Sequence, residues 1–227
     1  MEKVLYVLWA PSPRDELAAA LSELGPRGLQ VNLADEHVVP AWGGRLQVED
    51  PPMAAMVALW LDSATAAARA PYEAVLDAAT SRVAGYLVTE SEPLPNTAHP
   101  SPAGERTWGF SQLAFLRRPE RLRPDEFVET WQRVQTTMAM ETQSTFRYVQ
   151  NVVARRLTID APPWAGIVEE CFPIEAMVDL HVFYDAVGSD ERLSDHMTRM
   201  MEAVNQFQDT GATDVVWTSE YVYRRPW

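Results

Sequence analysis

The chain contains the same order of predicted elements twice, and this repeat constrains the fold more than any other feature of the sequence. In the first run, β-rich segments and helical patterns follow the order β-α-β-β-α-β. The strands are expected at 3–9, 29–34, 54–62 and 82–92, and the helices at 12–24 and 63–81. This order is typical of the ferredoxin-like unit. We expect an interruption of the second helix at Pro71, because proline lacks a backbone N–H.

The second run begins after residues 93–106, whose Pro-, Ser-, Asn- and Gly-rich sequence indicates a linker. Its strands are expected at 108–118, 146–156, 166–172 and 213–225, with a helix at 124–140 and two successive helices within 174–209. We therefore predict an N-terminal ferredoxin-like unit at 1–95, a linker at 96–106 and a C-terminal unit at 107–227. The predicted fold class is α+β, with the antiparallel sheets of two tandem βαββαβ units packed into one pseudo-dimeric α+β barrel.

Charge and cysteine content exclude several classes of function. The net charge of −13 opposes binding to nucleic acid or to an anionic membrane, which need clustered Lys and Arg. Cys171 is the only cysteine, so an internal disulfide is excluded and a reducing compartment is favoured. The chain start lacks the pattern of a signal peptide, and no apolar run approaches the roughly 20 residues that span a bilayer. We expect a cytoplasmic protein.

The second run resembles the EthD-like family of the dimeric α+β barrel superfamily. The similarity runs through "QLAFLRRPERLRPDEFVETWQRVQ", "RYVQNVV" and "WAGIVEECF", within residues 107–227, and extends to 1–100 only in outline. The positions that match the family pattern are Phe127, Trp131, Tyr148, Gln150, Asn151, Gly166 and Glu169. The resemblance implies an α+β barrel that acts on small molecules, with its site in the second run.

Two positions depart from that family pattern. The helix histidine is replaced by Gln135, and the histidine of the following strand is replaced by Val152. Those histidines are the natural general acid or base of such a site, because imidazole titrates near neutral pH. Glutamine exchanges no proton at that pH, but its amide binds a carbonyl or polarises an oxyanion. Another group must therefore carry the proton if the chain is catalytic.

His181 and Glu169 are the predicted catalytic residues. On a helix, His181 shares an apolar face with Met177 and Tyr184, and Asp185 lies four residues on, where it could orient the imidazole. Packing alone is the alternative explanation for this histidine. Glu169 and Glu170 occupy opposite faces of a short strand, so one of them should point inward among apolar neighbours, which would raise its pKa. The family resemblance implies that this residue is Glu169. It would then be a general base, or else the partner of an Arg or a backbone group.

The remaining predicted site residues bind and orient the substrate. They are Gln135, Trp131, Tyr148, Asn151, Tyr184 and His196. Tyrosine and asparagine would bind a substrate oxygen, although packing is the commoner fate of a strand aromatic. Most of the tryptophans, in both halves, are expected in the core, and a cavity lined by aromatic residues and methionine between sheet and helices would suit a flat hydrophobic ligand.

No cofactor is expected, because GxGxxG, GxxxxGK[ST], GxSxG, HExxH and CxxC are all missing from the sequence. No metal site is predicted, and haem held by His181 or His196 is a minor alternative. The predicted function is that of a cofactor-independent lyase or isomerase acting on an aromatic, polyketide-like or lactone-like molecule. The alternatives are a non-catalytic binding or accessory barrel and a pure assembly protein without a cavity. The chain would be a monomer with an internal pseudo-dimer or a homodimer.

Overall fold

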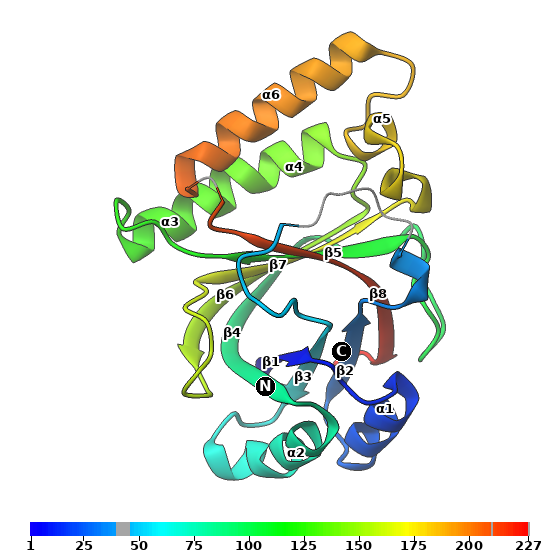
Figure 1. Cartoon of the computed structure of the whole chain (residues 1–227), viewed down its shortest axis with the longest axis vertical. Helices are drawn as coiled ribbons and strands as arrows, with labels where there is room; N and C mark the ends of the chain where they lie inside the picture. The colour runs from blue at the N-terminus through cyan, green and yellow to red at the C-terminus, as the bar shows by residue number, and fades with distance from the viewer. Residues whose placement is uncertain (40–45, 210, 227) are drawn as a thin grey trace.

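Eight antiparallel strands form a closed barrel in the computed structural model, which describes residues 1–39, 46–209 and 211–226. The strand order around the barrel is β1-β3-β2-β8-β5-β7-β6-β4. Helices cover the barrel on two opposite sides, with α1 and α2 on one and α3, α4 and α6 on the other (Figure 1). This confirms the α+β fold predicted from the repeated element order.

The first four strands form one half of the barrel, in the order β4-β1-β3-β2. The elements of this half are β1 (Glu2–Trp9), α1 (Arg14–Glu23), β2 (Gly28–Leu33), the short 3-10 helix η1 (Glu36–Val38), β3 (Ala55–Leu61), α2 (Ala66–Ala79) and β4 (Arg82–Leu94). The helix α2 continues through Pro71, so the interruption expected there was wrong. Pro71 lies inside α2, where its missing N–H removes one intrahelical bond, and the helix extends on both sides of it.

The last four strands repeat this arrangement, in the order β8-β5-β7-β6. The elements are β5 (Phe110–Leu116), α3 (Pro124–Thr130), η2 (Trp131–Gln135), α4 (Thr136–Thr142), β6 (Arg147–Arg156), β7 (Gly166–Phe172), η3 (Ile174–Met177), α5 (Leu180–Phe183), α6 (Asp190–Phe207) and β8 (Asp214–Arg224). In both halves the first and third strands of the unit pair at the centre of the sheet, so the two sheets have the same topology.

Two seams join the halves into one barrel. At the first seam β2 pairs with β8, and Val31 lies opposite Tyr221. At the second seam β4 pairs with β6, and Thr89 lies opposite Val152. The last strand of each unit thus pairs with the second strand of the other. No sheet edge remains among these eight strands, which removes the unpaired N–H and C=O groups that an open sheet would present.

Apolar side chains fill three separate regions. The outer face of the first sheet packs against α1 and α2 around Tyr6, Leu59 and Leu76. The barrel interior contains a second apolar cluster that includes Trp9 and Trp164. The third cluster lies between the outer face of the second sheet and its helices.

The predicted helix at 124–140 contains a π-helical turn, η2, between α3 and α4. The backbone N–H of Thr136 donates to the carbonyl of Trp131, five residues back, which is the π-helical pattern. The first of the two later helices is reduced to the short segments η3 and α5. Within the described parts of the chain, no helix combines the length and apolarity needed to cross a membrane.

Candidate functional site

A cavity of about 530 Å³ lies between the outer face of the second sheet and the helical layer above it. Strand residues Gln112, Glu170 and Tyr148 line its floor. The walls come from the helical segments and include Trp131, Gln135, Gln143, Phe183, Tyr184, Met200, Val204 and Phe207. The volume is in the range of small-molecule sites, and the lining is mainly apolar and aromatic with few polar groups, as in most ligand pockets.

Four floor residues form a continuous row across four strands. The register places Gln112 opposite both Trp217 and Glu170, and it places Glu170 opposite Tyr148. The indole Nε1 of Trp217 donates to Gln112 Oε1 at 3.1 Å, and Gln112 Nε2 donates to Glu170 Oε2 at 3.0 Å. The indole bond fixes the orientation of the Gln112 amide, so that its N–H group faces the carboxyl of Glu170.

Glu170 is the titratable group of this floor. It is 5% exposed, and burial among apolar side chains raises its pKa to about 7, despite the hydrogen bond from Gln112 that favours the charged form. The carboxyl therefore exists in both protonation states near neutral pH. A group with this property can accept and release protons within one turnover.

Glu169, the predicted base, lies on the opposite face of β7 and points into the barrel. Burial opposes its ionisation, but the charges of Lys3 and Arg147 outweigh burial and lower its pKa to about 2. Lys3 Nζ lies 2.9 Å from Glu169 Oε1, and Gln30 Nε2 donates to Oε2 at 2.6 Å. The expectation of a raised pKa at Glu169 was wrong, because Lys3 and Arg147 lie close to its carboxylate inside the barrel.

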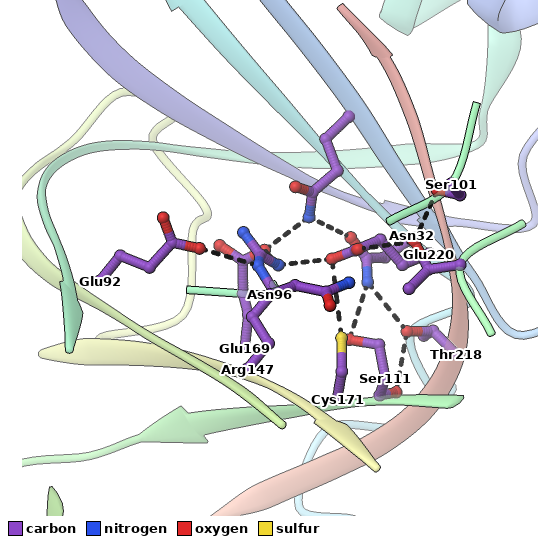
Figure 2. Close-up of polar contacts among 12 residues, drawn as sticks. Asn32, Glu92, Asn96, Ser101, Ser111, Arg147, Glu169, Cys171, Thr218 and Glu220 are labelled. Carbon is purple, nitrogen blue, oxygen red and sulfur yellow. Dashed lines mark hydrogen bonds and ion pairs between the residues drawn. The ribbon is translucent and has the colours of Figure 1, made fainter. Parts of the chain in front are cut away.

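Glu169 belongs to a buried polar network inside the barrel (Figure 2). Arg147 bonds Glu220 and also lies 3.0 Å from Glu92 Oε1. Lys3 additionally contacts Glu90 Oε1 at 2.9 Å. The two cations come from different halves of the chain, so the network connects the two sheets.

Trp131 and Tyr148 come together beneath the π-helical turn. Trp131 is fully buried, and its Nε1 donates to Tyr148 Oη at 3.4 Å. Gly166 allows this position, because a Cβ there would lie 2.5 Å from the Trp131 ring. Burial raises the pKa of Tyr148, so its phenol stays neutral and keeps its proton for donation.

Gln135 and Tyr184 also line the cavity. Gln135 Nε2 donates to the Met200 thioether sulfur at 3.0 Å. Burial raises the pKa of Tyr184 as well, and its backbone carbonyl is the partner of a neighbouring histidine.

Asn151 and His196, both predicted to bind substrate, are held elsewhere. Asn151 faces the barrel interior, where its Nδ2 donates to Glu169 Oε1 at 2.9 Å. His196 is buried in α6, and its Nδ1 lies 2.6 Å from the carbonyl oxygen of Tyr184. Neither side chain is part of the cavity lining. A binding role for either therefore has no support from the geometry of this cavity.

His181 lies outside the cavity lining, on the one-turn helix α5. Its Nε2 lies 2.8 Å from Asp190 Oδ1, and Asp179 is 3.6 Å from its other ring nitrogen. The expectation that Asp185 orients His181 was therefore wrong. The predicted helical face that joined Met177, His181 and Tyr184 does not exist. A new helix begins after its N-cap Asp179 and ends at Tyr184.

Sequence reasoning missed the lining residues Gln112, Gln143 and Trp217, and it named Glu169, which is outside the lining, rather than its neighbour Glu170, which is part of it. Strand alternation does place Gln112, Tyr148 and Glu170 on faces of β5, β6 and β7, but no local signal tells which face meets the helices. In the described residues, no group of three or more His, Cys, Asp or Glu side chains has the geometry of a metal site.

Comparisons with known proteins give likenesses of fold only. No family model and no curated protein matches the chain. An anthrone oxidase-like protein of solved structure is 9% identical, over 97% of this chain and 91% of that chain, with a TM-score of 0.49. A protein described as a "putative monooxygenase" from Lactobacillus acidophilus is 8% identical, over 98% and 93%, with a TM-score of 0.43. Likenesses this distant assign neither an activity nor a ligand to this chain.

Proposed function

We propose that the chain is an enzyme that moves protons on a small hydrophobic molecule bound in the cavity of the second half, with Glu170 as the proton carrier. One observation carries this proposal: a buried carboxyl with a pKa of about 7 lies at the floor of an apolar cavity of about 530 Å³. Apolar surroundings that raise a carboxyl pKa toward neutrality are typical of catalytic acids and bases.

The surrounding groups suit the remaining roles. The neutral phenol of Tyr148 lies opposite Glu170 and can donate to a substrate oxygen as negative charge develops there. Trp131 and Phe183 would hold a flat ring system. The reaction classes that need only these groups are isomerisation, dehydration, cyclisation and C–C cleavage, and none of them needs a group beyond the chain itself.

We further propose that the second half is an EthD-like unit in which the proton carrier has changed position. The motif residues Trp131, Tyr148 and Gly166 contact one another or the cavity, as residues of a common site would. Gln135 stands at the cavity in place of the family histidine, and Glu170 supplies the titratable group that this replacement removes. The division into units at 1–95 and 107–227 is part of this proposal, and it is supported by the identical strand order of the two sheets.

A non-catalytic binding protein is the second candidate, and Gln135 favours it. A cavity without any titratable group would have decided for this candidate. The presence of Glu170 in the lining favours the enzyme instead. The cavity itself argues against a pure assembly protein, in which the sheet and helices would pack without space between them.

The test is exchange of substrate carbon-bound hydrogen with deuterated water, followed by mass spectrometry over a panel of neutral aromatic ketones, phenols and lactones. Oxygen uptake is recorded in parallel, so that an oxygenation would be seen. Glu170→Gln should slow exchange at least about 100-fold while retaining ligand binding. Glu120→Gln, at an exposed glutamate, is the matched control. Exchange at the wild-type rate in Glu170→Gln would refute the role of Glu170, and binding without exchange would establish the binding protein.

A further inference from the structure

Four acidic side chains are buried in the described part of the chain, and Glu170 is the one without a counter-charge. Each of the other three lies within 4.0 Å of a cation, in the pairs Glu169–Lys3, Glu220–Arg147 and Asp214–Arg117. No cation contributes to the pKa of Glu170, and no ion pair between described residues includes it. A buried carboxylate is costly without a partner of opposite charge, so this site differs from the other three in what it lacks.

One oxygen of the Glu170 carboxyl is open to the cavity. Gln112 Nε2 donates to Oε2 at 3.0 Å, and the described residues give Oε1 no hydrogen bond. Oε1 is nevertheless not among the enclosed polar atoms that lack a partner in the described chain, so it keeps accessible surface. Because Glu170 lines the cavity, that surface belongs to the cavity. A positive charge can therefore reach the carboxyl through this space.

The cavity lining offers no positive charge of its own. None of its described residues is Lys, Arg or His. Its charged members are Glu170 and Asp209, and Asp209 is exposed and paired with Arg121 at 3.2 Å. The net charge of the whole chain is −13, so the surrounding field also favours a cation over an anion.

Aromatic rings of the lining suit a cation that carries an apolar body. Phe183 and Tyr184 pack edge to face, with their ring centroids 5.1 Å apart. Burial and, after it, the charge of Glu170 raise the pKa of Tyr184, so this phenol lies within electrostatic reach of the carboxyl. The electron-rich faces of aromatic rings attract organic cations, and the same rings exclude water from the apolar part of a ligand.

We infer that the cavity binds a hydrophobic monocation, an ammonium group attached to an aromatic body, with Glu170 as its counter-ion. The bound cation would give Glu170 the partner that the other buried carboxylates already have. An anion would meet the carboxylate without compensation, and a neutral analogue would leave it unpaired. This inference rests on the cavity being the ligand site of the proposed function, but it requires no turnover.

The cation should compete with a proton for Glu170. With a pKa of about 7, the ionised fraction of this carboxyl is about 0.9 at about pH 8 and about 0.03 at about pH 5.5. Affinity for a permanent cation should therefore fall roughly 30-fold between these pH values. The other titratable groups nearby are the phenols of Tyr148 and Tyr184, whose raised pKa keeps them neutral, and the exposed Asp209. His196 of α6 is outside the lining, and its Nδ1 contacts the carbonyl oxygen of Tyr184.

The experiment compares three probes on one ring system: naphthylmethyl-trimethylammonium, naphthalenemethanol and naphthoate. The charge of the first probe is permanent, so only the protein titrates. Binding is measured by calorimetry to the wild type, to Glu170→Gln and to Asp209→Asn, the second charged position of the lining. Glu120→Gln, at an exposed glutamate, is the matched control. Circular dichroism and thermal unfolding verify that each variant is folded.

At about pH 8 the cation should bind the wild type at least about tenfold more tightly than the alcohol, and naphthoate should bind most weakly. In Glu170→Gln this preference should fall below about twofold and lose its pH dependence, whereas Asp209→Asn and Glu120→Gln should retain both. Equal binding of cation and alcohol to the wild type, tighter binding of naphthoate, a preference that survives in Glu170→Gln, or no binding of the cation would overturn the inference. Loss of the preference in Asp209→Asn alone would also overturn it, because the counter-ion would then be Asp209.

The binding comparison and the hydrogen-exchange assay separate the two proposals. If Glu170→Gln leaves hydrogen exchange unchanged but abolishes the preference for the cation, the proposed proton transfer fails and the ligand class stands. If exchange depends on Glu170 but the cation and the alcohol bind equally, only the ligand class fails.

Discussion

The two faces of β7 place adjacent glutamates in opposite electrostatic environments. Glu169 faces the barrel interior and has a pKa of about 2, whereas Glu170 faces the cavity and has a pKa of about 7. Both side chains are buried, with 0% and 5% exposure. Burial raises the pKa of both carboxyls, so burial does not account for the difference between them. For Glu169 the charges of Lys3 and Arg147 outweigh burial and lower the pKa, whereas for Glu170 burial outweighs the hydrogen bond from Gln112 and raises it.

The two helix–sheet interfaces differ in a related way. In the first half, β3 presents apolar side chains such as Val57 and Leu59 to the helices, where they belong to one buried cluster with Leu76 of α2. In the second half, β7 presents Val168 and Glu170, and a cavity remains. One sheet topology thus provides a packed scaffold on one side of the barrel and a ligand-sized space on the other. Four predictions test these contrasts, in order of decreasing effect.

Lys3→Met should destabilise the protein by about 3–5 kcal/mol, because it leaves Glu169 charged and buried with one cation fewer. Urea unfolding monitored by fluorescence measures the loss. The double variant Lys3→Met/Glu169→Met should recover much of it, since the uncompensated charge is then removed. A loss below about 1 kcal/mol in the single variant would show that the barrel network does not hold Glu169 as described.

Leu76→Ala and Leu116→Ala should differ in cost. Leu76 is fully buried in the apolar cluster of the first interface, so its truncation should cost about 3 kcal/mol. Leu116 lines the cavity and has fewer packing partners on that side, so its truncation should cost roughly half as much. Denaturant unfolding at one pH gives both values. Equal costs would mean that the second interface is packed as tightly as the first.

Glu170→Gln should stabilise the protein at high pH. The folded-state pKa of about 7 lies above the ordinary glutamate pKa of 4.5, so the folded state binds more protons than the unfolded state between these values. Wild-type stability contributed by this group therefore falls as pH rises through that window, and the penalty is complete above about pH 7. The variant should gain on the order of 2 kcal/mol at about pH 8 and nothing at about pH 4. A gain of the same size at both pH values would contradict the assignment.

Gln112→Leu should raise the pKa of Glu170 further, because the amide N–H that stabilises the charged carboxyl is lost. The effect should be about 1 kcal/mol or less, the typical value of one hydrogen bond. Titration of the glutamate carboxyl carbons by NMR measures it, with Gln132→Leu as an exposed control. An unchanged or lowered pKa would show that Gln112 does not orient or stabilise Glu170.

The sequence by itself determined the order of the strands, their approximate lengths and their antiparallel pairing, because periodicity and turn residues act locally. The family resemblance grouped Trp131, Gln135 and Tyr148 in one site, and all three line the cavity. The helical period gave a wrong prediction for His181. The predicted helix is divided where Asp179 caps a new segment, so His181 does not share a continuous apolar helical face with Met177.

Only the tertiary structure decided which of the two adjacent glutamates has its pKa raised and which has it lowered. Alternation shows that Glu169 and Glu170 point to opposite faces of β7, but both faces are buried in a barrel that is covered by helices. The pKa of each carboxyl depends on the charged side chains that other elements place beside it. For Glu169 that charge includes Lys3, which lies 166 residues away in the sequence and 2.9 Å away in space. Contacts of this kind arise only when the two halves close into one barrel.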